Sequence, residues 1–443
     1  MLPEHYFIII PAIILAVIVF GICLFNSKIN ILFLALTVYW GTLLCMEIGF
    51  TLKAVQVFTV LGLISLIFRE LLFVKNRHAF SLFRLPVSYY LPFLLFIFIA
   101  LLSLINSSGT ESIRLLINYL WLQLTAFILV ATIKSENFLK KVINVSFLSC
   151  FITILIGYFE QIGYYTGLYD PFQYFDTNSV FTAFYGPILR MSPGTFANEY
   201  GKILQTNAIM ITTYLILGKK LINTKERFIY SIFLFLLICS LIINLTRSSW
   251  IAYIIALVLL LFICRLRLKT WILLFLGITF SLTVLYITGM VFIDTNIISI
   301  IFQRFEEFSF LTSYSAGMRL ESWGYALEQF IENPLIGKGF GSLVETHSVF
   351  LQLLAETGIL GCITFYSMLG FIFWRIINVI KSNNEFLKVT GIGLLLSLVG
   401  CFLYDLTNHG IHHFVLWFLT GLALASDLLV KKNSQKNKLK DID

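Results

Sequence analysis

The chain has 443 residues, of which 59% are hydrophobic and only 12% are charged. Soluble domains carry roughly 25% charged residues, so a soluble fold is excluded by composition. Apolar runs of about 20 residues, the length that crosses a bilayer as a helix, recur from end to end. The sequence therefore predicts an all-α, polytopic membrane protein whose residues 1–443 form a single integral domain.

The formal net charge of +8 does not indicate nucleic acid as a partner. The lysines and arginines gather in short loops between apolar segments, where they set the orientation of membrane helices. We therefore expect the lipid bilayer, and no nucleic acid, around this chain.

Thirteen apolar segments follow one another along the chain. The first three are so closely spaced that one of them fits a re-entrant or interfacial segment, so about 12–13 transmembrane helices are expected. The segments lie near 6–24, 29–48, 52–74, 87–105, 112–133, 142–165, 200–218, 228–246, 249–264, 271–292, 348–374, 388–407 and 412–430.

Six basic stretches orient these segments. They are 75–84, 134–141, 219–227, 264–269, 374–381 and the tail at 431–443. Placing all of them in the cytoplasm gives a consistent alternation through the C-terminal two-thirds and a cytoplasmic C-terminus. The N-terminus lies outside with thirteen helices and inside with twelve, because its first residues carry no Lys or Arg.

The same orientation puts two long loops on the outer face, at about 166–199 and 293–347. Loops of this length are usually functional. The second loop contains a predicted amphipathic helix near 318–331, which Asn333 and Pro334 terminate. We expect the functional site to be built from these two loops.

Three arginines belong to this outer face or its boundary: Arg190, Arg247 and Arg319. Arg190 or Arg319 alone is explained equally well by an arginine that reaches toward lipid headgroups. Arg247 carries more weight, because it lies in a short turn between two apolar helices, where an ionisable side chain is a functional hypothesis by default.

Together these arginines would suit a diphosphate, since guanidinium groups bind phosphate oxygens as a bidentate fork. The acidic residues of the same face, Asp170, Asp176 and Asp294, are isolated and form no Asp-x-Asp pair. The sequence therefore favours charge neutralisation by arginine, without a metal or another cofactor.

His347, in the second loop, has two interpretations. An imidazole changes protonation near neutral pH and would serve as a general base. Alternatively, His347 caps the helix that follows it. Glu345 and Glu321 would orient the imidazole in the first case and are solvated in the second. Trp323 and the glycine-rich turn around Gly339 would support the site.

A second polar cluster near the last outer turn contains Asp405, His409, His412 and His413. Their spacing would bring several onto one helix face, as in a metal site. Gly410 argues against one continuous helix, so we expect these side chains to line the rim of the outer site.

Ordered motifs across about 185–365 resemble the O-antigen ligase and polymerase superfamily of bacterial envelope glycosyltransferases. His347 and Ser348, followed after nine residues by Gly358 and Gly361, look like the family's His signature and its G-x-x-G-like end. Further similar stretches lie upstream: R-x-x-x-W at Arg319–Trp323, NPLIGKGFG at 333–341, TRSSW at 246–250 with Ser248 where Gly is usual, and RMSPGTFANEYG around Arg190 with Glu199 where Pro is common.

The resemblance implies transfer of a glycan from undecaprenyl diphosphate to an acceptor sugar hydroxyl on the outer face of the inner membrane. Arg190, Arg247 and Arg319 would hold the diphosphate, and His347 would deprotonate or orient the acceptor. Inversion of the anomeric centre would follow from attack on the opposite face. His409, His412 and His413 would form the acceptor rim.

Two functions share this donor site. A polymerase would add the growing glycan to a lipid-linked repeat unit, with a chain-length regulator as a further candidate partner, and is the leading hypothesis. A ligase would transfer the glycan to lipid A core or another acceptor. A flippase or transporter is a less favoured alternative, because the polar residues gather in outer loops and no repeated halves are visible.

Overall fold

The structure is a computed structural model. It describes residues 18–41, 43, 45–47, 51–72, 85–107, 109–168, 184–185, 188–193, 195–265, 268–292, 296–306, 314–343, 346–408 and 411–440.

Helices and two short hairpins make up the N-terminal part of the chain. In order these are α2 Ser27–Thr37, β1 Cys45–Glu47, β2 Thr51–Lys53, α3 Ala54–Leu72, α4 Val87–Ser103, the 3₁₀ turn η2 Leu104–Asn106, α5 Thr110–Thr132, α6 Glu136–Tyr165, β3 Phe184–Tyr185, β4 Ile188–Leu189 and α8 Ala197–Leu217. β1 pairs with β2, and β3 with β4, both antiparallel.

The remaining elements are helical. They are α9 Thr224–Ile243, α10 Arg247–Ile263, α11 Leu268–Phe292, α12 Ile297–Glu306, α13 Tyr314–Glu332, α14 Val349–Ile380, α15 Glu385–Asp405 and α16 Phe414–Lys440. Within the described residues, seven helical segments are long and apolar enough to cross a membrane: Val87–Asn106, Thr110–Thr132, Glu136–Tyr165, Thr224–Ile243, Val349–Ile380, Glu385–Asp405 and Phe414–Gln435. The predicted all-α polytopic membrane fold is confirmed.

One predicted apolar segment, 200–218, is of a different kind. It forms α8, which does not belong to the seven apolar spans of the described residues. α8 buries Lys202, Gln205 and Asn207, and it packs against α15, α9 and α10. Because protein surrounds it, α8 can carry polar side chains that a lipid-facing helix would not tolerate.

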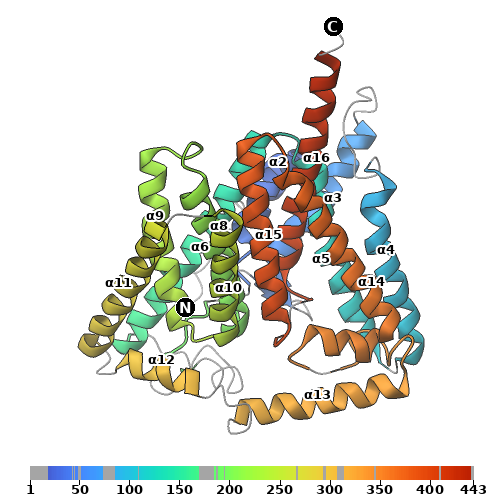
Figure 1. Cartoon of the computed structure of the whole chain (residues 1–443). Helices are drawn as coiled ribbons and strands as arrows, with labels where there is room; N and C mark the ends of the chain where they lie inside the picture. The colour runs from blue at the N-terminus through green and yellow to red at the C-terminus, as the bar shows by residue number, and fades with distance from the viewer. Residues whose placement is uncertain are drawn as a thin grey trace, which may run out of the picture.

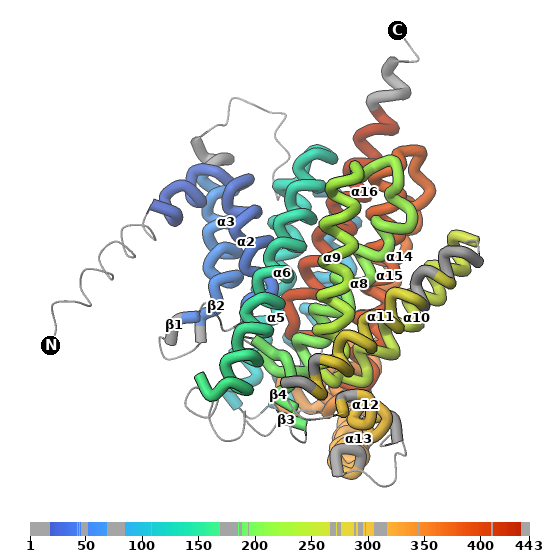
Figure 2. Tube along the Cα trace, turned by 90° about the vertical axis from the view of Figure 1, so that its left-hand side faces the viewer, coloured from blue at the N-terminus to red at the C-terminus, as the bar shows by residue number. Residues whose placement is uncertain are grey.

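The helices stand side by side, and α13 lies across one end of the bundle (Figure 1). The view at 90° places α12, β3 and β4 at that same end (Figure 2). The connections from α8 to α9 and from α14 to α15 lie at the opposite end, where α16 extends beyond its neighbours (Figure 1). The parts of the two predicted outer loops that are described thus gather at one end, which we call the α13 end.

α14 is two helices joined at a break. Gly358 has φ 65° and ψ −168°, which only glycine adopts easily, and a Cβ there would lie 2.3 Å from the carbonyl oxygen of Leu335. The first part of α14 runs across the bundle axis, and the second part joins the bundle (Figure 1). The G-x-x-G-like end of the His motif therefore marks a helix break.

The turn before α14 satisfies the backbone groups that this break leaves open. The N–H groups of Lys338 and Gly339 donate to the carbonyls of Ala355 at 2.8 Å and Glu356 at 3.0 Å. On the other side of the break, the N–H of Ile359 donates to the carbonyl of Pro334 at 2.9 Å. A broken helix within a membrane protein is tolerated where protein groups pair its backbone in this way.

Candidate functional site

A cavity of about 820 Å³ lies at the α13 end, between the starts of α5, α8 and α16, the end of α15 and the turn before α14. A volume of this size holds a drug-sized ligand. Its charged and imidazole side chains are Lys53, Glu111, Arg190, Glu199, Lys338, His347, His412 and His413. Four predicted site residues from three distant parts of the sequence, Arg190, His347, His412 and His413, therefore line one cavity.

Arg190 is buried in the wall of this cavity, with 7% of its surface exposed. Its Nε donates to the carbonyl oxygen of Asn244 at 2.9 Å, and Nη2 donates to Asn198 Oδ1 and Thr246 Oγ1, both at 2.9 Å. Asn244 and Thr246 form the turn that leads into Arg247. The first outer loop is thus fixed to the turn that carries the second arginine.

Arg247 is the first residue of α10, one position after the N-cap Thr246. Its Nη1 donates to the carbonyl oxygen of Arg304 at 3.4 Å. Arg304, in the last turn of α12, stacks on the ring of Tyr185 at 3.8 Å. Arg304 was not among the predicted site residues. Its position, a basic residue at the end of a short amphipathic helix in an outer loop, could have indicated it.

Four arginines near the cavity, Arg190, Arg247, Arg304 and Arg319, each lie within electrostatic reach of at least one other, and Arg190 lines the cavity. Burial and the positive charge of Arg304 lower the pKa of Arg190 to about 9. Burial, followed by the charges of Arg247 and Arg304, lowers the pKa of Arg319. Like charges that are partly buried together disfavour their own charged state, and an anionic ligand would relieve that cost.

His347 lines the cavity from the segment just before α14. Its backbone φ is 51°, in the left-handed region that few non-glycine residues occupy. The residue that caps α14 is Ser348, whose side chain accepts from the N–H of Leu351. The interpretation of His347 as the helix cap is therefore wrong. His347, with its strained backbone, forms part of the cavity wall instead.

Gly339 holds this region in place through a close approach. It has φ 123°, and a Cβ on it would lie 2.5 Å from Cβ of Ser107. Next to it, the N–H of Phe340 donates to Ser103 Oγ at 2.9 Å. These contacts fasten the glycine-rich turn to the end of α4. Lys338 and Gly341 of the same turn line the cavity.

The remaining supporting residues are placed differently. Glu321 is exposed on α13. Nε1 of Trp323 is buried, and no described residue accepts a hydrogen bond from it. Glu345 and His409 lie outside the described residues.

The predicted polar cluster near the last turn divides into separate contacts. Asp405 lies 2.7 Å from Nζ of the fully buried Lys202. His412 meets the ring of Phe340 edge-on at 5.8 Å between centroids, and His413 Nε2 lies 3.1 Å from Glu199 Oε1. Among the members of the cluster that the structure describes, Asp405 pairs with Lys202 and the two histidines contact different residues, so these three do not form one metal-like set.

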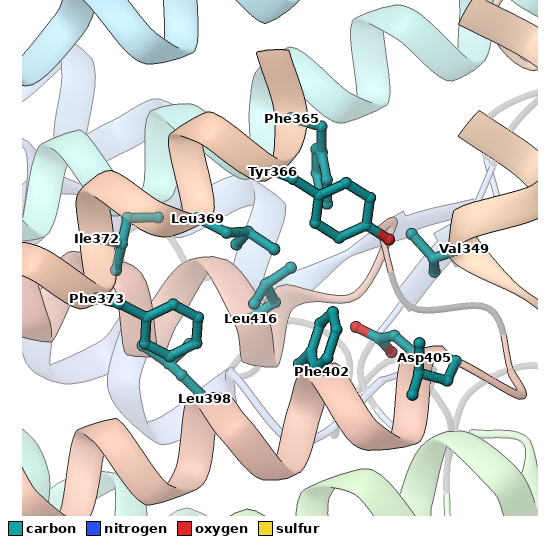
Figure 3. Close-up of a pocket in the computed structure, with 11 residues that line it drawn as sticks. Val349, Phe365, Tyr366, Leu369, Ile372, Phe373, Leu398, Phe402, Asp405 and Leu416 are labelled. Atoms are coloured by element: carbon teal, nitrogen blue, oxygen red, sulfur yellow. The ribbon is translucent and has the colours of Figure 1, made fainter. Parts of the chain in front are cut away.

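A second cavity, of about 20 Å³, has room for roughly one water molecule. Figure 3 shows Leu369, Leu416 and the rings of Phe373 and Phe402 around it, with the carboxylate of Asp405 at one end. Its size and apolar walls leave the larger cavity as the candidate site.

Comparison with known proteins adds a family to this geometry. Residues 232–366 match the family model Wzy_C, described as O-Antigen ligase. The match supports the O-antigen ligase and polymerase superfamily, as the motifs predicted. A search of curated proteins gives no match.

The matched segment contains Arg247, Arg304, Arg319 and His347. Arg190 lies outside it and joins it through the hydrogen bonds to the Asn244–Thr246 turn. The candidate site is therefore shared between the matched domain and flanking helices.

Proposed function

We propose that the protein is a glycosyltransferase that polymerises undecaprenyl diphosphate-linked oligosaccharide repeat units into surface polysaccharide. The reaction takes place on the outer face of the bacterial inner membrane. One observation carries this proposal: the cluster of Arg190, Arg247, Arg304 and Arg319 next to a cavity that His347 also lines.

The arginine cluster would bind the diphosphate of the donor. Guanidinium groups remain charged and contact phosphate oxygens in pairs. Mutual repulsion in a partly buried cluster favours an anion of high charge, and a diphosphate spans more than one guanidinium. As the donor's glycosidic bond breaks, the same cations stabilise the negative charge that develops on the leaving diphosphate.

His347 would serve the acceptor. Its imidazole takes the proton from the acceptor hydroxyl while the hydroxyl oxygen bonds to the anomeric carbon of the donor. The bond between that carbon and the diphosphate oxygen breaks, and undecaprenyl diphosphate leaves with the electron pair. Attack opposite to the leaving group inverts the anomeric centre, and arginine charge alone neutralises the leaving group.

The position of the site supports an enzyme over a transporter. Its charged residues gather at the α13 end of the bundle. In the proposed topology that end faces the periplasm, and the C-terminal end of α16 lies in the cytoplasm. A chain-length regulator would bind elsewhere on the polymerase.

A ligase is the second candidate, because the matched family is described as O-Antigen ligase. It would use the same donor site and transfer the finished glycan to lipid A core or another acceptor. The difference between the two activities then lies in the acceptor half of the cavity.

Purified protein incubated with undecaprenyl diphosphate-linked repeat units alone tests the proposal. A ladder of longer lipid-linked glycans on a gel is the expected result. Transfer that appears only after lipid A core is added makes the protein a ligase. The absence of transfer under both conditions, with folded protein, contradicts glycosyl transfer altogether.

A further inference from the structure

Glu199 and His413 form a carboxylate–imidazole pair in the wall of the large cavity. Glu199 lies in the first turn of α8, and His413 directly precedes α16. Oε1 of Glu199 lies 3.1 Å from Nε2 of His413, and Oε2 accepts a hydrogen bond from Thr195 Oγ1 at 2.5 Å. Both carboxylate oxygens are therefore engaged, which fixes the orientation of the carboxylate.

We propose that this pair is a binding site for a hydroxyl group of the acceptor sugar. His413 contacts the sugar, and Glu199 is a positioning residue that acts through His413. The proposal rests on the proposed glycosyl transfer and assigns the acceptor half of that same site.

The geometry sets which nitrogen meets the ligand. A neutral imidazole donates from one nitrogen and accepts at the other. In the neutral imidazole, the nitrogen that faces the carboxylate oxygen, Nε2, carries the hydrogen, and Nδ1 is the acceptor. No described residue donates to Nδ1 of His413, whereas the ring as a whole lines the cavity. A sugar hydroxyl is a donor of the right type for this nitrogen.

The carboxylate of Glu199 adds a charge opposite in sign to that of Arg190 in the same cavity wall. Lys53, at the end of β2, lies within electrostatic reach of Glu199 and also lines the cavity. Its charge favours the ionised carboxylate that holds the Nε2–H tautomer. An ionised Glu199 would repel a diphosphate, whereas it would not repel neutral hydroxyl groups.

The limits of the matched segment separate most of the donor half from this pair in sequence. Arg247, Arg319 and His347 lie within 232–366, whereas Glu199, His413 and the donor-site residue Arg190 lie outside it. A chemical step shared by a family is expected in the shared segment. The recognition of an acceptor that differs between members is expected outside it, where this pair lies.

The test uses purified full-length protein and varies the acceptor. A lipid-linked glycan of several repeats serves as donor at a fixed, saturating concentration, and the single lipid-linked repeat unit is titrated as acceptor. Lipid A core replaces the repeat unit if wild-type protein uses only that acceptor. The variants are His413→Ala, His413→Asn and Glu199→Gln. Glu385→Gln is the matched control, since it removes an exposed carboxylate at the opposite end of the bundle.

For His413→Ala we expect the acceptor concentration at half-maximal rate to rise about 10-fold, the worth of one strong hydrogen bond. The maximal rate and the affinity for undecaprenyl diphosphate, measured by native mass spectrometry, stay within about 3-fold of wild type. His413→Asn recovers part of the loss, because its side-chain oxygen accepts a hydrogen bond near the position of Nδ1. Glu199→Gln gives an intermediate rise, and Glu385→Gln gives none.

Unchanged acceptor dependence in folded His413→Ala overturns the inference, and so does a fall in maximal rate with an unchanged half-saturation point. If His413→Ala does not fold, His413→Asn and Glu199→Gln decide by the same criteria. Failure of the proposed function is a separate result, because wild-type protein would then transfer no glycan at any acceptor concentration.

Discussion

Nε of Arg190 donates a hydrogen bond to the carbonyl oxygen of Asn244 at 2.9 Å. This contact crosses from the first outer loop to the turn that begins α10. It places Arg190 beside Arg247 although the two residues are far apart in sequence. The donor site we propose depends on this connection, because a diphosphate needs several guanidinium groups held at one place.

Arg190→Lys tests the fork geometry while it keeps the charge. A lysine presents one ammonium group and cannot reach the three acceptors that Arg190 contacts. We expect kcat/KM for glycan transfer to fall about 100-fold. Arg265→Gln, at an exposed site before α11, is the control. Transfer by Arg190→Lys at the wild-type rate would show that charge alone is needed.

His347→Asn tests the proposed base with little disturbance of the backbone. Asparagine tolerates the left-handed conformation at φ 51° better than most residues, whereas it has no group that takes up a proton at neutral pH. We expect transfer to slow about 100-fold to 10,000-fold. The thermal unfolding midpoint and the affinity for undecaprenyl diphosphate should stay close to wild type. A variant that retains more than a tenth of the activity would rule out general-base catalysis by His347.

Gly339→Ala tests the turn that precedes α14. The new Cβ would meet Cβ of Ser107 at 2.5 Å, and φ 123° is unfavourable for alanine. We expect a loss of about 1–3 kcal/mol of stability together with reduced transfer. Ser107→Gly in the same chain should restore only part of the steric loss, because Cα of residue 107 still lies 3.0 Å from the new Cβ. Gly324→Ala, in α13 with open space around its Cβ position, should be neutral or stabilising.

The Lys202–Asp405 pair makes a prediction about stability. Removal of one partner leaves the other charge buried, which costs about 3–5 kcal/mol. Lys202→Met and Asp405→Asn should each lower the unfolding midpoint strongly. The double variant Lys202→Met/Asp405→Asn should lose less than the sum of the two, as a double-mutant cycle in detergent would measure. Additive losses would mean that the two side chains act independently.

Composition and segment hydropathy were sufficient to predict the membrane fold, because the bilayer imposes a length and an apolarity on each helix. They predicted a helix at 200–218, which forms α8, but they did not show that its lysine and amides are hidden by neighbouring helices. The break at Gly358 was also missed. A glycine at helix-like spacing carries no local sign that distant carbonyl and N–H groups, in the turn 334–339, will pair with the opened backbone.

Residues of the candidate site were predictable where a charged or titratable side chain is unusual among its neighbours in the sequence. Arg247, next to apolar helices, and His347, in a glycine-rich segment, stood out in the sequence. Glu199 did not, because an acid at a helix start is ordinary, and its partner His413 lies beyond the α15 helix. Such a pair arises only from packing of α8 against its neighbours and leaves no local pattern.

In the proposed mechanism, the arginine cluster holds a diphosphate leaving group during glycan transfer. The most direct measurement is the release of undecaprenyl diphosphate per glycosidic bond formed, with purified wild-type protein and its Arg247→Ala and Arg319→Ala variants. We predict one undecaprenyl diphosphate released per bond by wild type and almost none by either folded variant. Bond formation without this release, or equal rates in the variants, would contradict the claim.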